Sequence, residues 1–183
     1  MVRKLLRNKP SDKDYSQRED LFHTRCKFLE KTCSLIVDSG SCTNCCSTRL
    51  VDKLSLPKLP HPKPYKLQWV NSDGGLVVNQ LVNIPITIRK YQEKVLCDII
   101  PMEAGHILLE RPWQYDNKTL HDGLANKITF LHHGKKITLC PLSPSQLKED
   151  QIKLNKKKEE EEKQKTKVKK RPQKRLKGAK RRL

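Results

Sequence analysis

The C-terminal segment constrains the fold of this chain most, because it offers almost nothing from which a core could be built. From Lys148 to Leu183 the sequence holds 17 basic and 6 acidic residues, a balance of +11 out of +19 for the whole chain. Its apolar residues are only Ile152, Leu154, Val168, Leu176, Ala179 and Leu183. Such a composition cannot bury enough apolar surface to offset the entropy of the chain. Residues 145–183 are therefore predicted to be a disordered, basic, Lys/Glu-rich linker or tail, with at most a transient helix around Glu159–Lys165.

The N-terminal end gives no sign of a sorting signal. Residues 1–17 are polar and charged without periodicity, which predicts a flexible leader. Its apolar stretch, Leu5-Leu6, is too short for a secretory signal, and no apolar run approaches the roughly 18 residues of a membrane span. We therefore expect an intracellular protein, cytoplasmic or nuclear, whose seven cysteines stay reduced.

Residues 18–144 have the length of one domain and are too short for a two-lobed enzyme of roughly 300 residues. Short runs of alternating apolar and polar residues dominate this segment. The predicted strands are Leu21–Leu29, Thr32–Val37, Tyr65–Val70, Leu76–Val78, Leu81–Ile88, Lys94–Ile100, Lys127–His132 and Lys136–Leu139. Tight turns are expected at Asn71–Gly75 and at His133-Gly134. Many short strands favour a closed or sandwiched all-β domain.

Two short helices interrupt the strands. Cys46, Leu50 and Leu54 are spaced four residues apart, which predicts an amphipathic helix with Thr43 or Asn44 as its N-cap. Four prolines between positions 57 and 64 then predict an extended, non-helical connector. A second short helix is expected around Pro112–Tyr115.

Asp38-Ser39-Gly40 is the candidate site for chemistry. It follows the apolar triplet Leu35-Ile36-Val37, so a buried strand would deliver a carboxylate to a tight turn that Gly40 permits. The alternative is a structural turn, in which Asp38 ends the strand and binds nearby amides.

Several segments, in order, resemble one protein family. Ser34–Asn44 resembles the active-site segment of retropepsin-like aspartic proteases, more specifically the protease region of gypsy-class LTR-retrotransposon Pol polyproteins of plants. Further similar blocks are Pro62–Trp69, Val95–Asp98, Pro101–Leu109 and Arg111–Gln114. Leu139–Gln151 and the Lys/Glu-rich stretch after it are similar to the spacer before the reverse transcriptase. The resemblance covers about Gln17 to Lys170, and it identifies the chain as a truncated fragment of such a polyprotein.

The resemblance implies a retropepsin-like closed β-barrel that works as an aspartic endopeptidase on polypeptides. Hydrolysis by this route needs two carboxylates that share one proton. With one Asp-Ser-Gly per chain, the pair is expected to be Asp38 and its copy in a homodimer, supported by Ser39 and Gly40. The hairpin tip Asn71, Ser72, Asp73, Gly74 and Gly75 would be the mobile flap. No cofactor, metal or membrane is expected.

One residue departs from the family pattern. Glu110 stands between Leu109 and Arg111, where the family has a glycine beside the catalytic loop. We expect that the backbone shifts there, or that Glu110 points to solvent or pairs with Arg111, and that turnover is weak. The competing hypothesis is a catalytically degenerate remnant whose basic tail makes weak, nonspecific contact with nucleic acid.

The cysteines and tryptophans carry weaker signals. Cys42, Cys45 and Cys46 have the spacing of metal ligands, but no second Cys/His pair stands at the distance of a zinc site. They are expected to be small apolar residues of the core or of a helix face. Trp69 and Trp113 are expected to anchor the core or the flap.

Overall fold

The computed structural model describes residues 20–28, 31–67 and 75–169. The chain divides into two units, Met1–Pro144 and Ser145–Leu183. The predicted leader at residues 1–17, Trp69 and the flap residues Asn71 to Gly74 lie outside the described residues. None of the described helices combines the length and the apolar character that a membrane span requires.

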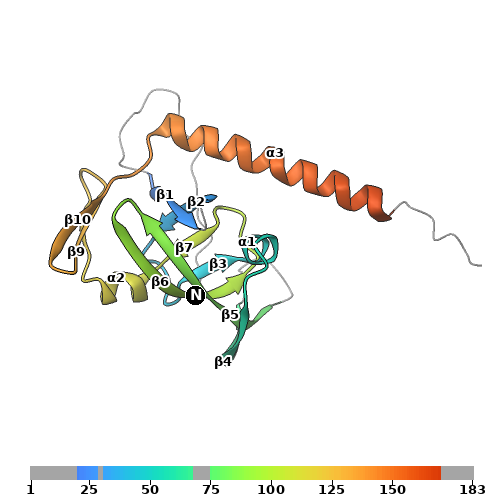
Figure 1. Cartoon of the computed structure of the whole chain (residues 1–183), viewed down its shortest axis with the longest axis horizontal. Coiled ribbons are helices and arrows are strands. Elements are labelled where there is room, and N and C mark those ends of the chain that lie inside the picture. Colours follow the sequence, from blue (N-terminus) through green and yellow to red (C-terminus); the bar gives the residue numbers. More distant parts are fainter. Residues whose placement is uncertain (1–19, 29–30, 68–74, 170–183) are drawn as a thin grey trace, which may run out of the picture. The chain divides into compact units, whose positions relative to one another are not determined.

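The described part of the first unit is an all-β domain built on a closed ring of six strands (Figure 1). The strands follow the order β1-β2-β7-β3-β6-β5, and a bridge between Lys27 and Thr87 joins β5 back to β1. Their bounds are Phe22–Phe28 (β1), Lys31–Val37 (β2), Cys45–Ser47 (β3), Leu76–Ile88 (β5), Tyr91–Ile100 (β6) and Ile107–Leu109 (β7). Closure leaves the six strands of the ring with few free edges, which would otherwise invite aggregation.

The hairpin predicted between the first two strands is present: β1 and β2 pair in antiparallel register with Cys26 opposite Cys33. β5 and β6 form a second hairpin, paired from Leu81 opposite Asp98 to Ile88 opposite Tyr91. The ring also contains two parallel pairs, β2 with β7 and β3 with β6. Those parallel pairs bring together segments that are far apart in the sequence.

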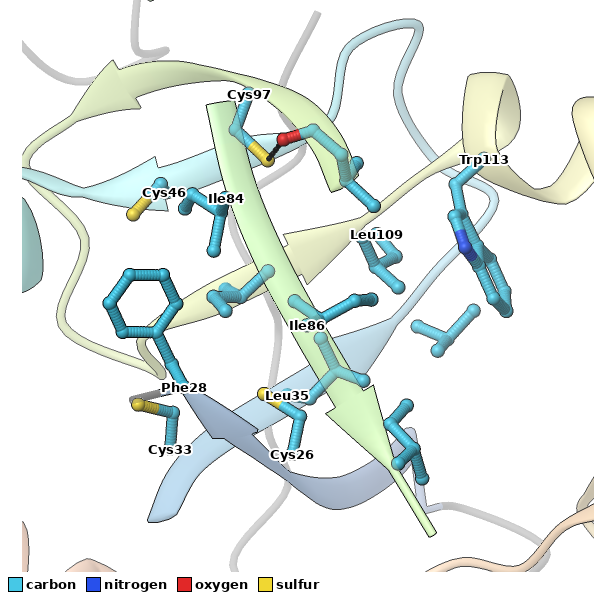
Figure 2. Packing of buried hydrophobic residues seen from close by; sticks show 14 of the residues in the cluster. Cys26, Phe28, Cys33, Leu35, Cys46, Ile84, Ile86, Cys97, Leu109 and Trp113 are labelled. Carbon is cyan, nitrogen blue, oxygen red and sulfur yellow. Dashed lines mark hydrogen bonds between the residues drawn. The ribbon is translucent and has the colours of Figure 1, made fainter. Parts of the chain in front are cut away.

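The core lies inside the ring. Figure 2 shows Leu35 and Leu109, from the adjacent strands β2 and β7, packed with Ile84 and Ile86 of β5. Trp113 closes one side of this cluster, and its indole N–H donates to the Tyr91 hydroxyl at 2.9 Å. Trp113 is thus a core residue, as expected.

The proline-rich segment is a strand rather than the expected connector. β4 (Lys58–Leu67) pairs with β5, and the register shifts between Pro60 and Tyr65. Proline is tolerated in a sheet at an edge strand or at a bulge, and β4 provides both. The strand prediction that began at Tyr65 missed this because it treated proline only as a chain breaker.

The first helix begins later than predicted. Cys45–Ser47 forms β3, and α1 (Thr48–Lys53) follows it. The N-cap is Ser47, whose hydroxyl accepts the Leu50 N–H at 3.3 Å, and not Thr43 or Asn44. Cys46 has the spacing of a helix face, but pairing with β6 and β7 holds it in extended backbone. The second helix, α2 (Arg111–Asp116), is confirmed.

A separate three-stranded sheet follows α2. Its order is β10-β9-β8, with β9 at Lys127–His132 and β10 at Lys135–Leu139, as predicted. His133 and Gly134 both have positive φ, which fits the tight turn expected between these strands. The short strand β8 (Leu120–Asp122) was not predicted.

The second unit contains a helix where the sequence predicts disorder. α3 spans Pro144–Lys169, and residues 170–183 lie outside the described range. Lysine and glutamate are good helix formers, and glutamates precede lysines at helical spacing here. The prediction allowed only a transient helix around Glu159–Lys165 because the segment cannot build a core, but a helix needs no core to satisfy its own backbone hydrogen bonds.

Candidate active site

Asp38 stands at the end of two buried parallel strands. β2 ends at Val37, which lies opposite Leu109 of β7, and the Asp38 N–H donates to the Leu109 carbonyl at 2.9 Å. Val37 and Leu109 are both buried, whereas Asp38 is half-buried. The fold thus carries one carboxylate from a rigid core to the rim of the barrel.

Gly40 leaves room for this carboxylate. The Gly40 N–H donates to Asp38 Oδ1 at 3.2 Å. A Cβ at position 40 would lie 3.3 Å from Asp38 Oδ2 and 3.5 Å from Oδ1, and the shorter of these distances is tighter than almost all Cβ contacts. A side chain at position 40 would therefore force the Asp38 carboxylate to shift by a few tenths of an ångström.

Residues of the segment that follows β7 form hydrogen bonds with the loop of residues 38–44. The Gln114 side chain, from α2, donates to the Asp38 carbonyl at 2.8 Å. The Glu110 N–H donates to Asn44 Oδ1 at 3.0 Å, and the Ser41 N–H donates to Glu110 Oε2 at 2.8 Å. These contacts fix the loop near its start, middle and end.

Glu110 behaves differently from the sequence expectation. Its side chain is 1% exposed, so it does not point to solvent, and its carboxylate binds the Ser41 amide rather than the expected Arg111. Its backbone is extended, with φ −112° and ψ −164°, so the position does not use the freedom of a glycine. The prediction assumed a crowded turn that only glycine could occupy.

The environment of Glu110 changes its titration. Burial raises the pKa of its carboxyl to about 7. The hydrogen bond from Ser41 opposes this shift, and the charge of Asp38 adds to it. Glu110 is thus neutral in acid and becomes negative near neutral pH.

A second buried carboxylate, Asp98, was missed by sequence reasoning. It is 3% exposed in β6; its Oδ2 accepts the Tyr65 hydroxyl at 2.5 Å, and its Oδ1 lies 3.3 Å from His61 Nε2. Burial, followed by the hydrogen bond to Asp98, raises the pKa of Tyr65 to about 12. Tyr65 and His61 both come from β4, so this network ties the proline-rich edge strand to the barrel. No periodicity marks it, because Tyr65 and Asp98 are 33 residues apart.

Asp98 also borders a cavity of about 470 Å³ on the barrel wall. The cavity is lined by residues of the loop after Asp38, Cys42 to Asn44, and by His61, Glu93 and Trp113. Glu93 accepts hydrogen bonds from the Trp113 indole at 3.0 Å and the Asn117 amide at 3.3 Å. Glu93 and Asp98, two of the carboxylates that line the cavity, therefore make hydrogen bonds that stabilise the fold.

The cysteines do not converge on a metal position. Within the described ranges, no group of three or more His, Cys, Asp or Glu side chains is placed to hold a metal ion. Cys45 and Cys46 are buried in β3, while Cys42 is exposed. Burial raises the pKa of the Cys45 thiol to about 11 and that of Cys46 to about 12, so both stay protonated.

Of the predicted site residues, Asp38, Ser39 and Gly40 lie together at the end of β2, with Ser39 and Gly40 exposed. Gly75, the one described flap candidate, is exposed just before β5.

A family model, the PEG10/RTL1 protease domain, matches residues 34–136, more than half of the chain. The chain belongs to the PEG10/RTL1 protease-domain family. This match confirms a retropepsin-like protease domain, while a plant gypsy-class origin stays a prediction.

Solved structures with retroviral protease folds are also similar to the chain. The retroviral protease-like domain of Ddi1 from Leishmania major is 12% identical, with a TM-score of 0.49, over 67% of this chain and 94% of that one. The EIAV protease in complex with the inhibitor HBY-793 is 18% identical, with a TM-score of 0.36, over 54% of this chain and 88% of that one. No curated protein matches the chain.

Proposed function

We propose that this PEG10/RTL1-type protease domain is an aspartic endopeptidase, active as a homodimer, in which two copies of Asp38 hydrolyse peptide bonds. The observation that carries the proposal is the placement of Asp38. Paired strands deliver it from the core, Gly40 makes space beside both oxygens, and Gln114 fixes its backbone. A turn that only ended a strand would need neither the close glycine nor the contact from α2.

The chemistry follows from two carboxylates that share one proton. The ionised member takes a proton from water as the water oxygen attacks the carbonyl carbon, and the protonated member donates to the carbonyl oxygen. The carboxyl that took the proton from water then gives it to the leaving nitrogen, the other carboxylate takes a proton from the diol hydroxyl, and the carbon–nitrogen bond breaks, which again leaves one proton on the pair. Like charges a few ångströms apart keep one proton on the pair, so the two macroscopic pKa values belong to the pair.

A second copy must supply the other carboxylate, because Asp-Ser-Gly occurs once in the sequence. Large apolar side chains are exposed in α2, the helix that contacts Asp38, and in the segment that follows it. Tyr115 is 82% exposed, Leu120 73% and Leu124 96%. We propose that these exposed apolar side chains contribute to the contact face between the two copies. The flap over the bound polypeptide would be the hairpin tip Asn71–Gly75.

The origin proposed for the domain is a gypsy-class retrotransposon Pol polyprotein, whose peptide bonds it would cleave. The blocks quoted above support this because they run in the same order as in that family. The seven cysteines, none of which forms a disulfide, fit action in the reducing interior of a cell, in the cytoplasm or nucleus.

The first prediction tests the catalytic role of Asp38. Asp38→Asn keeps the shape of the side chain but removes the charge that the pair shares, so cleavage of a fluorogenic peptide should fall by at least about 1,000-fold. The assay runs at pH 4–7 with and without a transition-state mimic of aspartic proteases. Activity per chain should also rise with protein concentration, because each site needs two copies.

Asp52→Asn is the matched control, since Asp52 is an exposed carboxylate paired with Lys58 on the surface. It should cleave like the natural chain. Full activity in Asp38→Asn, or a rate per chain that does not depend on concentration, would overturn the proposal.

The charge of the C-terminal segment favours a second candidate function. Its balance of +11 is suited to weak, nonspecific contact with nucleic acid, and a catalytically inactive remnant could act through it alone. Anisotropy of a labelled single strand tests this by its salt dependence. A chain that ends at Leu147 should lose the binding if the segment carries it.

A further inference from the structure

Glu110 connects the strand that supports Asp38 to the helix that contacts it. It follows Leu109, whose carbonyl accepts the Asp38 N–H, and it precedes α2, which supplies Gln114. From this junction its own N–H reaches Asn44, and its carboxylate reaches Ser41. One residue therefore contacts two points of the loop that carries Asp38.

The backbone N–H of Ser41 is buried away from water, and the Glu110 carboxylate is its hydrogen-bond acceptor. Ser41 is 4% exposed, and its N–H donates to Glu110 Oε2 at 2.8 Å. A buried amide without an acceptor destabilises the folded state. A buried carboxylate is also destabilising unless it is hydrogen-bonded, so the two groups depend on each other.

We propose that Glu110 is a positioning residue of the peptidase: its buried carboxylate fixes the backbone of residues 38–44 and thereby the direction of the Asp38 side chain. This inference rests on the proposed function. It reverses the expectation that Glu110 weakens the enzyme, because the extended backbone at this position does not need a glycine and the carboxylate is an acceptor that glycine lacks.

The placement of Glu110 also sets how its charge acts on the Asp38 pair. The ionisable groups around it are Asp38 after β2, Cys45 of β3, whose thiol is protonated, and the exposed Arg111 that follows it. Below about pH 6 Glu110 is neutral, so it leaves the acid limb of activity unchanged. Near pH 7 it becomes negative and disfavours loss of the proton that the pair shares. The pH above which activity is lost, the alkaline limb of the pH profile, is therefore higher than it would be without Glu110.

Three proteins test this inference: the natural chain, Glu110→Gln and Glu110→Ala. The amide oxygen of Gln can still accept the Ser41 N–H, so kcat at pH 5 should stay within about 3-fold of the natural value. Ala has no acceptor, so kcat should fall about 10-fold or more with KM changed little. In both variants, the pH above which activity is lost should be lower than in the natural chain. The pH below which activity is lost should not change.

Hydrogen exchange at the Ser41 amide gives a readout that needs no activity. Exchange should be about 10-fold faster in Glu110→Ala than in the natural chain and nearly unchanged in Glu110→Gln. A merely structural role would lower stability in both variants without moving either limb of the pH profile. Natural activity and an unmoved alkaline limb in Glu110→Ala would overturn the positioning role alone. A natural chain that cleaves nothing, although its Ser41 amide is protected, would overturn the proposed function and the positioning role with it.

Discussion

At the scale of single residues, Glu110 links stability to pH. Its pKa is about 7 in the folded chain, above its ordinary value of 4.5. Between these pH values the folded chain holds a proton that the unfolded chain has released, so stability falls as pH rises through this window. The loss attributable to Glu110 is at most about 3 kcal/mol.

We predict that Glu110→Gln removes this part of the pH dependence. Urea unfolding at pH 5 and pH 8 should show a smaller loss of stability for Glu110→Gln than for the natural chain, because glutamine does not titrate. Glu149→Gln, an exposed position on α3, is the control and should follow the natural chain. Equal losses in all three proteins would show that the Glu110 carboxyl titrates as if exposed.

Gly40 offers a second prediction at this scale. Gly40→Ala would place a Cβ 3.3 Å from Asp38 Oδ2, so the carboxylate must move by a few tenths of an ångström. We expect kcat to fall by about 10-fold or more, while the midpoint of thermal unfolding changes little.

Gly123→Ala is the matched control, because a Cβ there meets nothing within 4 Å. Kinetics and thermal unfolding of both variants check the pair. If Gly40→Ala is as active as Gly123→Ala, the Asp38 carboxylate tolerates displacement.

At the scale of elements, the attachment of β4 depends on a polar network. Tyr65 donates its hydroxyl proton to the buried Asp98, 33 residues further along the chain, and His61 approaches the other oxygen. β4 otherwise exposes most of its residues, and three of its ten residues are prolines. Few of its side chains are buried in the core, so the polar contacts matter more.

We predict that Tyr65→Phe destabilises the domain by about 1–3 kcal/mol, because it leaves the buried Asp98 carboxylate short of a donor. Chemical unfolding measures the change. Tyr115→Phe is the matched control, since Tyr115 is 82% exposed and its loss of a hydroxyl should be neutral. A destabilisation by Tyr65→Phe no greater than that by Tyr115→Phe would show that His61 alone satisfies Asp98.

At the scale of the whole molecule, the two units differ in what stabilises them. The first has a buried apolar core enclosed by the strand ring, whereas α3 is rich in lysine and glutamate and carries few apolar residues. A helix without a packed face opens locally far more often than a strand in a closed core.

Limited trypsin digestion should therefore remove residues 148–183 first and leave a core from about residue 20 to 142. Mass spectrometry of the fragments over time checks this order. A C-terminal segment that resists cleavage as long as the peptide around Trp113 would contradict it, and would indicate that α3 packs against a partner.

The sequence by itself determined the parts of the structure that rest on neighbouring residues. Alternation identified the β1–β2 and β9–β10 hairpins, and the apolar run before Asp38 placed the carboxylate at a strand end. These predictions were correct because strand period and turn chemistry are local.

Only the tertiary structure decided the rest. It paired β2 with β7 in parallel, drew Cys46 into a strand instead of a helix, and made the proline-rich segment an edge strand. It also buried Glu110 against Ser41, 69 positions earlier in the chain. The physical reason is the same in each case: contacts between distant segments set the backbone and the burial, and no local pattern records which segments will meet.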